Sequence, residues 1–214
     1  MKLENELELA KDASRKAASI LLEKRDSLNK LTSSSDKDIK LIADIESENL
    51  IKNTINQKSS FPILAEESGK SVNNLGEIFW IVDPLDGTAN YSRKIPFCAI
   101  SIALVRNLKP ILGVIYDFNN NDMYEGSINS KALLNGKEIC VSDIKIPEDG
   151  ILITGLPNDT DYSDNALMEM IKGFQKWRKV RMLGSAALAA AYVASGKADL
   201  YKEKRTYLWD VAAG

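Results

Sequence analysis

The sequence predicts a mixed α/β protein made of two αβ halves. In the first half, four short apolar segments between residues 79 and 125 follow one another with turns between them, which is typical of antiparallel strands. Beyond Pro147, segments that fit strands alternate with segments that fit helices, and a βαβαβ order requires parallel pairing. We therefore expect an N-terminal αβ domain over residues 1–146, with an antiparallel sheet, and a C-terminal βαβαβ domain over residues 147–214.

The segment before the antiparallel series is expected to be mainly helical. Apolar residues recur at helical spacing from Leu3 onward, and they do so again after Asp44, which is a favoured residue at a helix start. Serine-rich sequence between the two repeats indicates a loop. The expected elements are a helix over 3–28, a loop over 33–36, an extended segment over 38–42, a helix over 44–55 and a short strand over 61–65.

The remaining elements follow from the same patterns. Asn135-Gly136 lies between two apolar segments and indicates a two-residue hairpin turn. Gly196 is expected to end an alanine-rich helix. The expected strands are 79–82, 99–105, 111–116, 122–125, 151–154, 180–183 and 198–201, and the expected helices are 164–175 and 185–195.

The composition is that of an ordinary globular protein. The chain has 214 residues, a net charge of −2 and 44% hydrophobic residues, so neither a nucleic-acid-binding surface nor a membrane partner is expected. The charged start lacks an apolar signal segment and no apolar run could cross a bilayer, which makes the cytoplasm the expected location. Cys98 and Cys140 have no neighbouring metal ligands and are expected to be buried thiols in a reducing compartment.

The absence of histidine narrows the chemistry that the chain could perform. It excludes Ser-His-Asp triads, histidine general bases and most zinc sites. An enzyme of this composition has to use carboxylates, hydroxyls, lysines or a hard metal ion.

The most informative segment joins a buried strand to a pair of acids, Asp83 and Asp86. Pro84 is expected to end the strand because it offers no N–H, and Gly87 permits a tight turn beyond it. Two carboxylates about 5 Å apart repel by roughly 3 kcal/mol at an effective dielectric constant near 20. Mg²⁺ would offset this repulsion, since it prefers oxygen ligands and needs no histidine. The alternative is an ordinary Asp-Pro turn followed by an Asp-Gly turn.

Acids also follow two other apolar segments. Glu66 and Glu67 end the short strand before a Ser-Gly turn, and Asp210 lies at an expected helix start after Trp209. Taken alone, the two glutamates fit a solvated loop and Asp210 fits a helix N-cap. Together with the central acid pair, they argue against the interpretation of Asp83 and Asp86 as ordinary turn residues.

In their order and spacing, the three motifs resemble those of the inositol monophosphatase family, part of the lithium-sensitive, magnesium-dependent phosphatase superfamily. The resemblance covers nearly the whole chain. It implies a layered αβαβα sandwich of the inositol monophosphatase/fructose-1,6-bisphosphatase type. It also implies hydrolysis of a small polyol or sugar phosphate by a metal-activated water, with two or three Mg²⁺ ions as cofactors. The motifs are Glu66-Glu67-Ser68, Asp83-Pro84-Leu85-Asp86-Gly87-Thr88-Ala89-Asn90-Tyr91 and Trp209-Asp210-Val211-Ala212-Ala213-Gly214.

The resemblance implies a role for each matched residue. Thr88 would position the attacking water, Asp44 would pair with that threonine, and Glu67 would help to hold further magnesium. Glu203 would bind the hydroxyls of the substrate, and Gly184-Ser185 would form a turn that contacts it. The implied metal ligands are Glu66, Asp83, the Leu85 carbonyl, Asp86 and Asp210, and the implied substrate contacts are Asp86, Gly87, Thr88, Gly184, Ser185, Glu203 and Asp210.

Several of these residues have simpler interpretations. Asp44 could cap the second helix, and Ser185 could cap the alanine-rich helix. Glu203 lies in a charged run and could be a solvated surface acid. These alternatives stay open at the level of sequence.

The sequence departs from the family pattern in two places. Serines occupy residues 33–35, where many relatives carry a lysine, and relatives continue beyond the Trp-Asp motif, whereas this sequence stops at Gly214 and is expected to be truncated. The expected partner is a small phosphorylated metabolite, and a homodimer is a further expectation from the family. The alternative functions are a phosphatase for 3′-phosphoadenosine 5′-phosphate or fructose 1,6-bisphosphate, and a non-catalytic relative that binds a metal or ligand.

Overall fold

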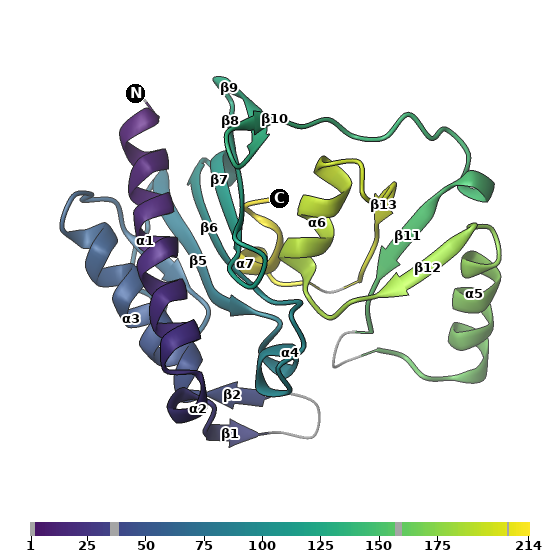
Figure 1. The fold of residues 1–214 in the computed structure, drawn as a ribbon, viewed down its shortest axis with the longest axis horizontal. Coiled ribbons are helices and arrows are strands. Elements are labelled where there is room, and N and C mark those ends of the chain that lie inside the picture. Colours follow the sequence, from purple (N-terminus) through teal and green to yellow (C-terminus); the bar gives the residue numbers. More distant parts are fainter. Residues whose placement is uncertain (1–2, 35–38, 157–159, 205) are drawn as a thin grey trace.

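The protein is described by a computed structural model over residues 3–34, 39–156, 160–204 and 206–214. Five layers of secondary structure lie side by side in it (Figure 1). This arrangement confirms the expected αβαβα sandwich. The layers are α1 (Glu4–Glu23) with α3 (Ile42–Asn56), an eight-stranded sheet, α6 (Ala186–Ala194) with α7 (Leu208–Val211), a three-stranded sheet, and α5 (Asp164–Phe174).

The eight-stranded sheet is antiparallel except at one pair of strands. Its strand order is β10-β9-β8-β7-β6-β5-β3-β4, and β3 runs parallel to β5. The expected Asn135-Gly136 hairpin joins β9 to β10. The strands are β3 (Ile63–Ala65), β4 (Gly69–Lys70), β5 (Ile78–Asp86), β6 (Ala99–Arg106), β7 (Lys109–Asp117), β8 (Asp122–Ser127), β9 (Ser130–Leu134) and β10 (Lys137–Glu138).

The three-stranded sheet is parallel, as the alternation of strands and helices predicts. Its order is β12-β11-β13, with β11 (Ile151–Thr154) between β12 (Lys179–Met182) and β13 (Leu200–Tyr201). The chain passes from β11 to β12 through α5, and from β12 to β13 through α6. A short 3-10 helix over Pro147–Asp149 precedes the sheet.

The N-terminal segment differs from the prediction in its details. The first helix ends at Glu23, because Lys24 leaves the helical conformation (φ −108°, ψ 17°), and a short helix α2 (Arg25–Leu28) follows. The sequence 33–34 is part of a strand, β1 (Leu31–Ser34), which pairs with β2 (Ile39–Leu41), and not of a loop. Residues 35–36 of the predicted loop, and residue 38 of the predicted extended segment, lie outside the described residues.

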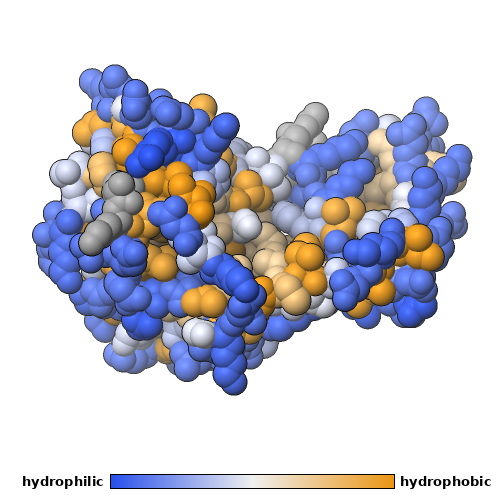
Figure 2. Space-filling model, turned by 90° about the horizontal axis from the view of Figure 1, so that it is seen from above, coloured by the Kyte–Doolittle hydropathy of each residue, from blue (hydrophilic) through white to orange (hydrophobic). Residues whose placement is uncertain are grey.

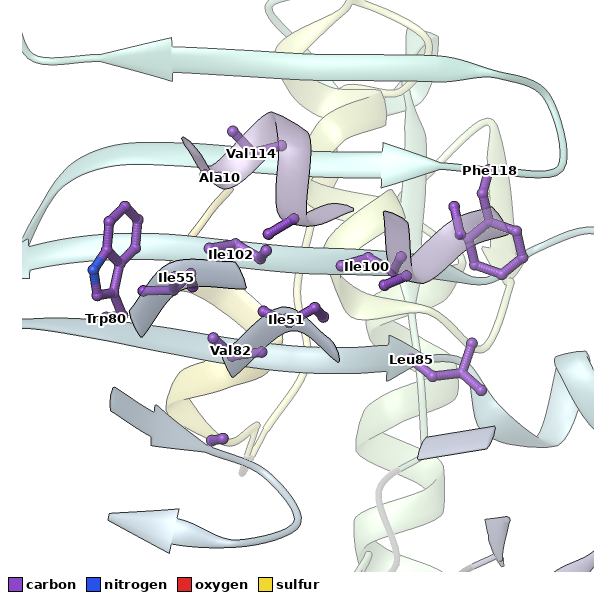
Figure 3. Close-up of a cluster of buried hydrophobic side chains, with 14 of the residues drawn as sticks. Ala10, Ile51, Ile55, Trp80, Val82, Leu85, Ile100, Ile102, Val114 and Phe118 are labelled. Atoms are coloured by element: carbon purple, nitrogen blue, oxygen red, sulfur yellow. The ribbon is translucent and has the colours of Figure 1, made fainter. Parts of the chain in front are cut away.

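The largest core lies between α1, α3 and the eight-stranded sheet (Figure 3). Ile51 and Ile55 of α3 face Trp80 and Val82 of β5, and Ile102 of β6 lies beside them. These side chains are at most 1% exposed, and full burial of each contributes about 1.5 to 3 kcal/mol. This core fixes α3 against β5, which matters below because both elements carry site residues.

Helices α6 and α7 join the two halves of the chain. On one side, Leu188 packs with Ile115 and Tyr124 of the eight-stranded sheet; on the other, Ala189 packs with Ile153 of β11. The chain segments 1–146 and 147–214 therefore share apolar clusters, and their division into two domains stays a prediction.

The segment between the two sheets corrects one expectation about the cysteines. Cys98 is buried at the start of the sheet core, but Cys140 is exposed, because the chain here runs along the surface toward β11. Hydrophilic residues cover most of the face in Figure 2, with smaller hydrophobic patches between them. None of the described helices is long and apolar enough to cross a membrane.

Candidate active site

The predicted acid pair lies at the end of β5, as expected, but Pro84 does not end this strand. Asp83 is opposite Ser101 of β6, and pairing resumes at Asp86, opposite Ala99, after a shift in register. Pro84 therefore lies within a bulge. The two strands are not paired there, so the N–H that proline lacks is not needed for a hydrogen bond between them. The bulge is closed locally by the Leu85 N–H, which donates to Asp83 Oδ1 at 3.0 Å.

Gly87 allows the chain to turn from β5 into the short helix α4 (Thr88–Ser92). Its φ of +88° lies in the left-handed region that favours glycine. A Cβ at this position would lie 2.9 Å from the Phe97 carbonyl oxygen and 3.0 Å from that of Gly184. The turn thus brings the segment after β5 against the turn that precedes α6.

The N-terminus of α6 holds the carboxylate of Asp86. Ser185 donates its hydroxyl to Oδ2, the Ala187 N–H donates to Oδ2 at 2.8 Å, and the Ala186 N–H to Oδ1 at 3.3 Å. Ser185 is also the N-cap, since its Oγ accepts the Leu188 N–H at 3.2 Å. A helix N-terminus stabilises a negative charge, so this contact favours the ionised form of Asp86.

Asp44 combines the two roles that the sequence left open. The second helix begins at Ile42, and Asp44 caps it from within its first turn, accepting the Leu41 N–H at 2.6 Å. Its other oxygen lies 2.8 Å from Thr88 Oγ1, which is also 3.0 Å from the Leu85 carbonyl. Because the hydroxyl has a single proton, the shorter bond to the carboxylate is expected to take it.

Glu66 and Glu67 follow β3 and lie next to the bulge of β5. The Glu66 N–H donates to the Val82 carbonyl at 3.1 Å, which continues the parallel pairing by one residue. Glu67 forms an ion pair with Lys40 at 3.1 Å, and only 12% of its side chain is exposed. These contacts do not fit the solvated loop that the sequence alone allows.

Asp210 comes to the same place from the other half of the chain. It lies in the first turn of α7 and caps this helix by accepting the Tyr207 N–H at 2.7 Å. Its charge acts on Glu66, Asp83 and Asp86, raising the pKa of each. The structure therefore brings all three predicted motifs together.

Burial is the main cause of the raised pKa values of these carboxyls. It raises the pKa of Glu66 to about 8 and that of Asp86 to about 7, with repulsion from neighbouring acids as a further cause. Burial and the charges of Glu66 and Asp86 raise the pKa of Asp83 well above its usual range. Burial also raises the pKa of Asp210, and that of Asp44 to about 6.

The donor set of this cluster fits a hard cation in its chemistry. Glu66, Asp83, Asp86 and Asp210 supply only oxygen, and across the described ranges none of the four is paired with a lysine or arginine. Glu66 and Asp83 are close enough to share a side-chain hydrogen bond. In the part of the chain that the structure describes, no three acids stand arranged around a common metal position.

Glu203 is a half-buried acid and not a solvated one. It accepts the Tyr201 hydroxyl at 3.0 Å, and burial raises its pKa. Its carboxylate lies against Gly155, where a Cβ would collide with it. Glu203 also lines a cavity of about 550 Å³ with Thr154 and Lys202.

Asn90 is a site residue whose contacts the sequence does not reveal. Its amide donates to the Phe97 and Leu183 carbonyls, both at 2.7 Å, and so ties the turn after β5 to the turn before α6. Only its position inside the central motif could have indicated a role. Lys40 is a second such residue, since it pairs with Glu67 across a gap of 27 residues.

The fold and these three motifs define a member of the inositol monophosphatase family. The model of this family matches residues 2–214, and the chain belongs to it. The fold agrees with that of an inositol monophosphatase from Anabaena, at a TM-score of 0.87 and 34% identity, over 100% of this chain and 80% of the other.

Two relatives carry different functional names. Nus factor SuhB of Xylella fastidiosa is 40% identical over 161 residues, which are 73% of this chain and 58% of the relative. A fructose-1,6-bisphosphatase/inositol-1-monophosphatase of Thermotoga maritima is 36% identical over 181 residues, which are 83% of this chain and 67% of the relative. The match to the Xylella protein thus spans less than two thirds of that relative.

Proposed function

We propose that the protein is a magnesium-dependent phosphomonoesterase that hydrolyses a small polyol or sugar phosphate of the inositol monophosphate kind. The observation that carries this proposal is the convergence of Glu66, Asp83, Asp86 and Asp210 beside the Thr88–Asp44 pair. Membership in the inositol monophosphatase family supports it.

The four carboxylates would hold the magnesium ions, together with the Leu85 carbonyl and, for a further ion, Glu67. When bound, magnesium would neutralise phosphate oxygens and make a water molecule more acidic. The number of ions, two or three, is part of the proposal.

Thr88 would orient the attacking water. Its proton is donated to Asp44 at 2.8 Å, so Oγ1 can only accept the next hydrogen bond. A water that donates to this oxygen is turned so that its lone pair faces away from Thr88 and toward the phosphorus. Asp44 would act on the water through Thr88, and it accepts this hydrogen bond most strongly when it is ionised.

The substrate is expected to lie beside the β5 bulge and the start of α6. Gly87, Gly184 and Ser185 are the proposed contacts there, and the positive end of α6, whose first N–H groups already bind Asp86, would favour an anion nearby. Because Ser185 already donates to Asp86, its contact with the substrate would use backbone or a lone pair. Glu203 would accept hydrogen bonds from substrate hydroxyls.

Phosphate release from a panel of substrates tests the function. Inositol 1-phosphate, fructose 1,6-bisphosphate and 3′-phosphoadenosine 5′-phosphate are each offered with Mg²⁺ and with EDTA. We expect Mg²⁺-dependent release, with inositol 1-phosphate the best substrate. Preference for either bisphosphate would move the assignment within the family, whereas a folded protein that is silent on all three would contradict the proposed activity.

The name of the Xylella relative favours a second candidate, a role in transcription as a Nus-type factor. This role would require a protein partner. That partner could bind to a surface of the proposed homodimer. Co-purification of tagged protein with a transcription complex tests it. An Asp86→Asn protein that co-purifies as the wild type does, but releases no phosphate, would show that the two functions are separate.

Replacing Gly155 by alanine should raise the KM for a hydroxyl-rich substrate by about 3- to 10-fold, with little change in kcat. An increase of this size corresponds to the loss of one modest hydrogen bond. The added Cβ would push away the Glu203 carboxylate, which is the flexible partner in this contact. Steady-state kinetics measure both constants. Gly173→Ala is the control, because nothing lies within 4 Å of a Cβ at that position. An unchanged KM would argue against Glu203 as a substrate contact.

A further inference from the structure

Helix α3 presents three polar side chains toward the candidate site from one face. Asp44, Ser47 and Glu48 are spaced so that they lie together on one side of a helix, and each is at most 2% exposed. Asp44 contacts Thr88, as described above. The other two have no part in the chemistry proposed so far, and a buried carboxylate and hydroxyl are costly unless they are hydrogen-bonded.

Glu48 holds the turn that carries Glu66 and Glu67. Its Oε2 accepts the Glu67 N–H at 2.8 Å, and its Oε1 lies 3.4 Å from Lys52 Nζ. Lys52 in turn donates to Ser68 Oγ at 2.8 Å. The turn is thus attached to α3 at two successive residues.

Ser47 holds the bulge that carries Asp83 and Asp86. Its hydroxyl donates to the Pro84 carbonyl at 2.8 Å, and the residue is fully buried. Pro84 and Leu85 lie between the two places where β5 pairs with β6, so the strand ladder does not fix the Pro84 carbonyl. This hydrogen bond supplies an orientation that the sheet does not.

We propose that Glu48 and Ser47 are positioning residues of the metal site, and that α3 sets the spacing between the two acid-bearing segments. The inference rests on the proposed function, because it takes Glu66, Asp83 and Asp86 as metal ligands. A metal site depends on the placement of its donors to within a few tenths of an ångström, and groups that orient the donors control affinity. Here the backbone that carries the donors is irregular on both sides, and one rigid helix contacts both.

Direct metal binding tests this proposal without the need for turnover. Mn²⁺ is titrated into the protein, and free Mn²⁺ is read from its electron paramagnetic resonance signal. Glu48→Ala should weaken binding by about 10- to 100-fold, and Ser47→Ala by about 10-fold, the range found when groups that orient metal ligands are removed. Glu48→Gln keeps an acceptor for the Glu67 N–H. Its affinity for Mn²⁺ should stay within about threefold of the wild-type value, because the proposal assigns the positioning to this hydrogen bond. Glu46→Ala is the matched control, since Glu46 is exposed on the opposite face of α3.

The variants separate positioning from general stability and from the proposed activity. Circular dichroism and thermal unfolding show which variants are folded. If Glu48→Ala does not fold, Glu48→Met takes its place. If neither of these two variants folds, Ser47→Ala alone tests the proposal. The proposal would be overturned if the folded variants that lack the Glu48 acceptor or the Ser47 hydroxyl bound Mn²⁺ with wild-type affinity. It would also be overturned if Glu48→Gln bound Mn²⁺ as weakly as Glu48→Ala. A wild type that binds Mn²⁺ but releases no phosphate would contradict the proposed function and leave this comparison intact. A wild type that binds no Mn²⁺ would contradict both.

Discussion

Replacing Asp86 by asparagine should lower phosphate release at saturating Mg²⁺ by at least about 100-fold, which is the cost of removing one preorganised electrostatic group from an active site. Asparagine has the shape of aspartate but lacks its charge. An amide oxygen in the place of Oδ2 can still accept the Ser185 hydroxyl and the Ala187 N–H, so only the longer bond from the Ala186 N–H is lost. The contact between β5 and α6 should therefore survive, while the affinity for a cation falls.

Parallel measurements distinguish lost chemistry from lost structure. Circular dichroism and a melting temperature close to that of the wild type, measured in EDTA at pH 5 where Asp86 is protonated, would show that the fold is intact. Asp143→Asn is the control, because Asp143 is exposed in the segment between the two sheets. Near-normal turnover of Asp86→Asn at saturating Mg²⁺ would refute the assignment of Asp86 as a metal ligand.

The sequence predicts the location of this chemistry better than its geometry. Asp83 and Asp86 follow a run of apolar residues, and that pattern correctly places both at the end of a buried strand. The effect of Pro84 was predicted wrongly, because a bulge can absorb a missing N–H and only the pairing with β6 reveals it. Strand ends are the part of an element that local sequence determines least.

Contacts between distant residues explain most of what the sequence could not supply. Asp86 meets Ser185 across 99 residues, and Glu48 meets Glu67 across 19. Each residue is ordinary in its local context: a serine at a helix start and a glutamate on an amphipathic helix. The spacing of Asp44, Ser47 and Glu48 was available in the sequence, but its meaning depends on α3 lying along the two acid-bearing segments, which tertiary packing decides.

Raising the pH from 5 to 8 should destabilise the metal-free protein, with a fall in melting temperature of at least about 5 to 10 °C. Burial raises the pKa of Asp86 to about 7, of Glu66 to about 8 and of Asp44 to about 6, so the folded state retains protons that the unfolded state releases above about pH 4. Stability contributed in this way is fully present below the unfolded pKa and is lost as the pH rises through the folded one. For Asp86 alone, the interval from pH 5 to 7 corresponds to about 3 kcal/mol, and each kcal/mol shifts the melting temperature of a chain of this size by about 2 to 4 °C. The other carboxyls act in the same direction.

Magnesium should remove most of this dependence, because a bound cation takes over the role of the protons. Thermal unfolding is measured at pH 5, 6, 7 and 8, in EDTA and in saturating Mg²⁺, and stabilisation by Mg²⁺ should grow with pH. Asp117 provides an internal comparison: burial also raises its pKa, but its carboxylate accepts hydrogen bonds from Asn120 at the C-terminal end of β7, two strands away from β5, so its contribution should persist in Mg²⁺. Asp86→Asn removes one of the titrating groups and should flatten the EDTA curve. Stabilisation by Mg²⁺ that is equal at pH 5 and pH 8 would mean that the buried carboxyls are not where the cation binds.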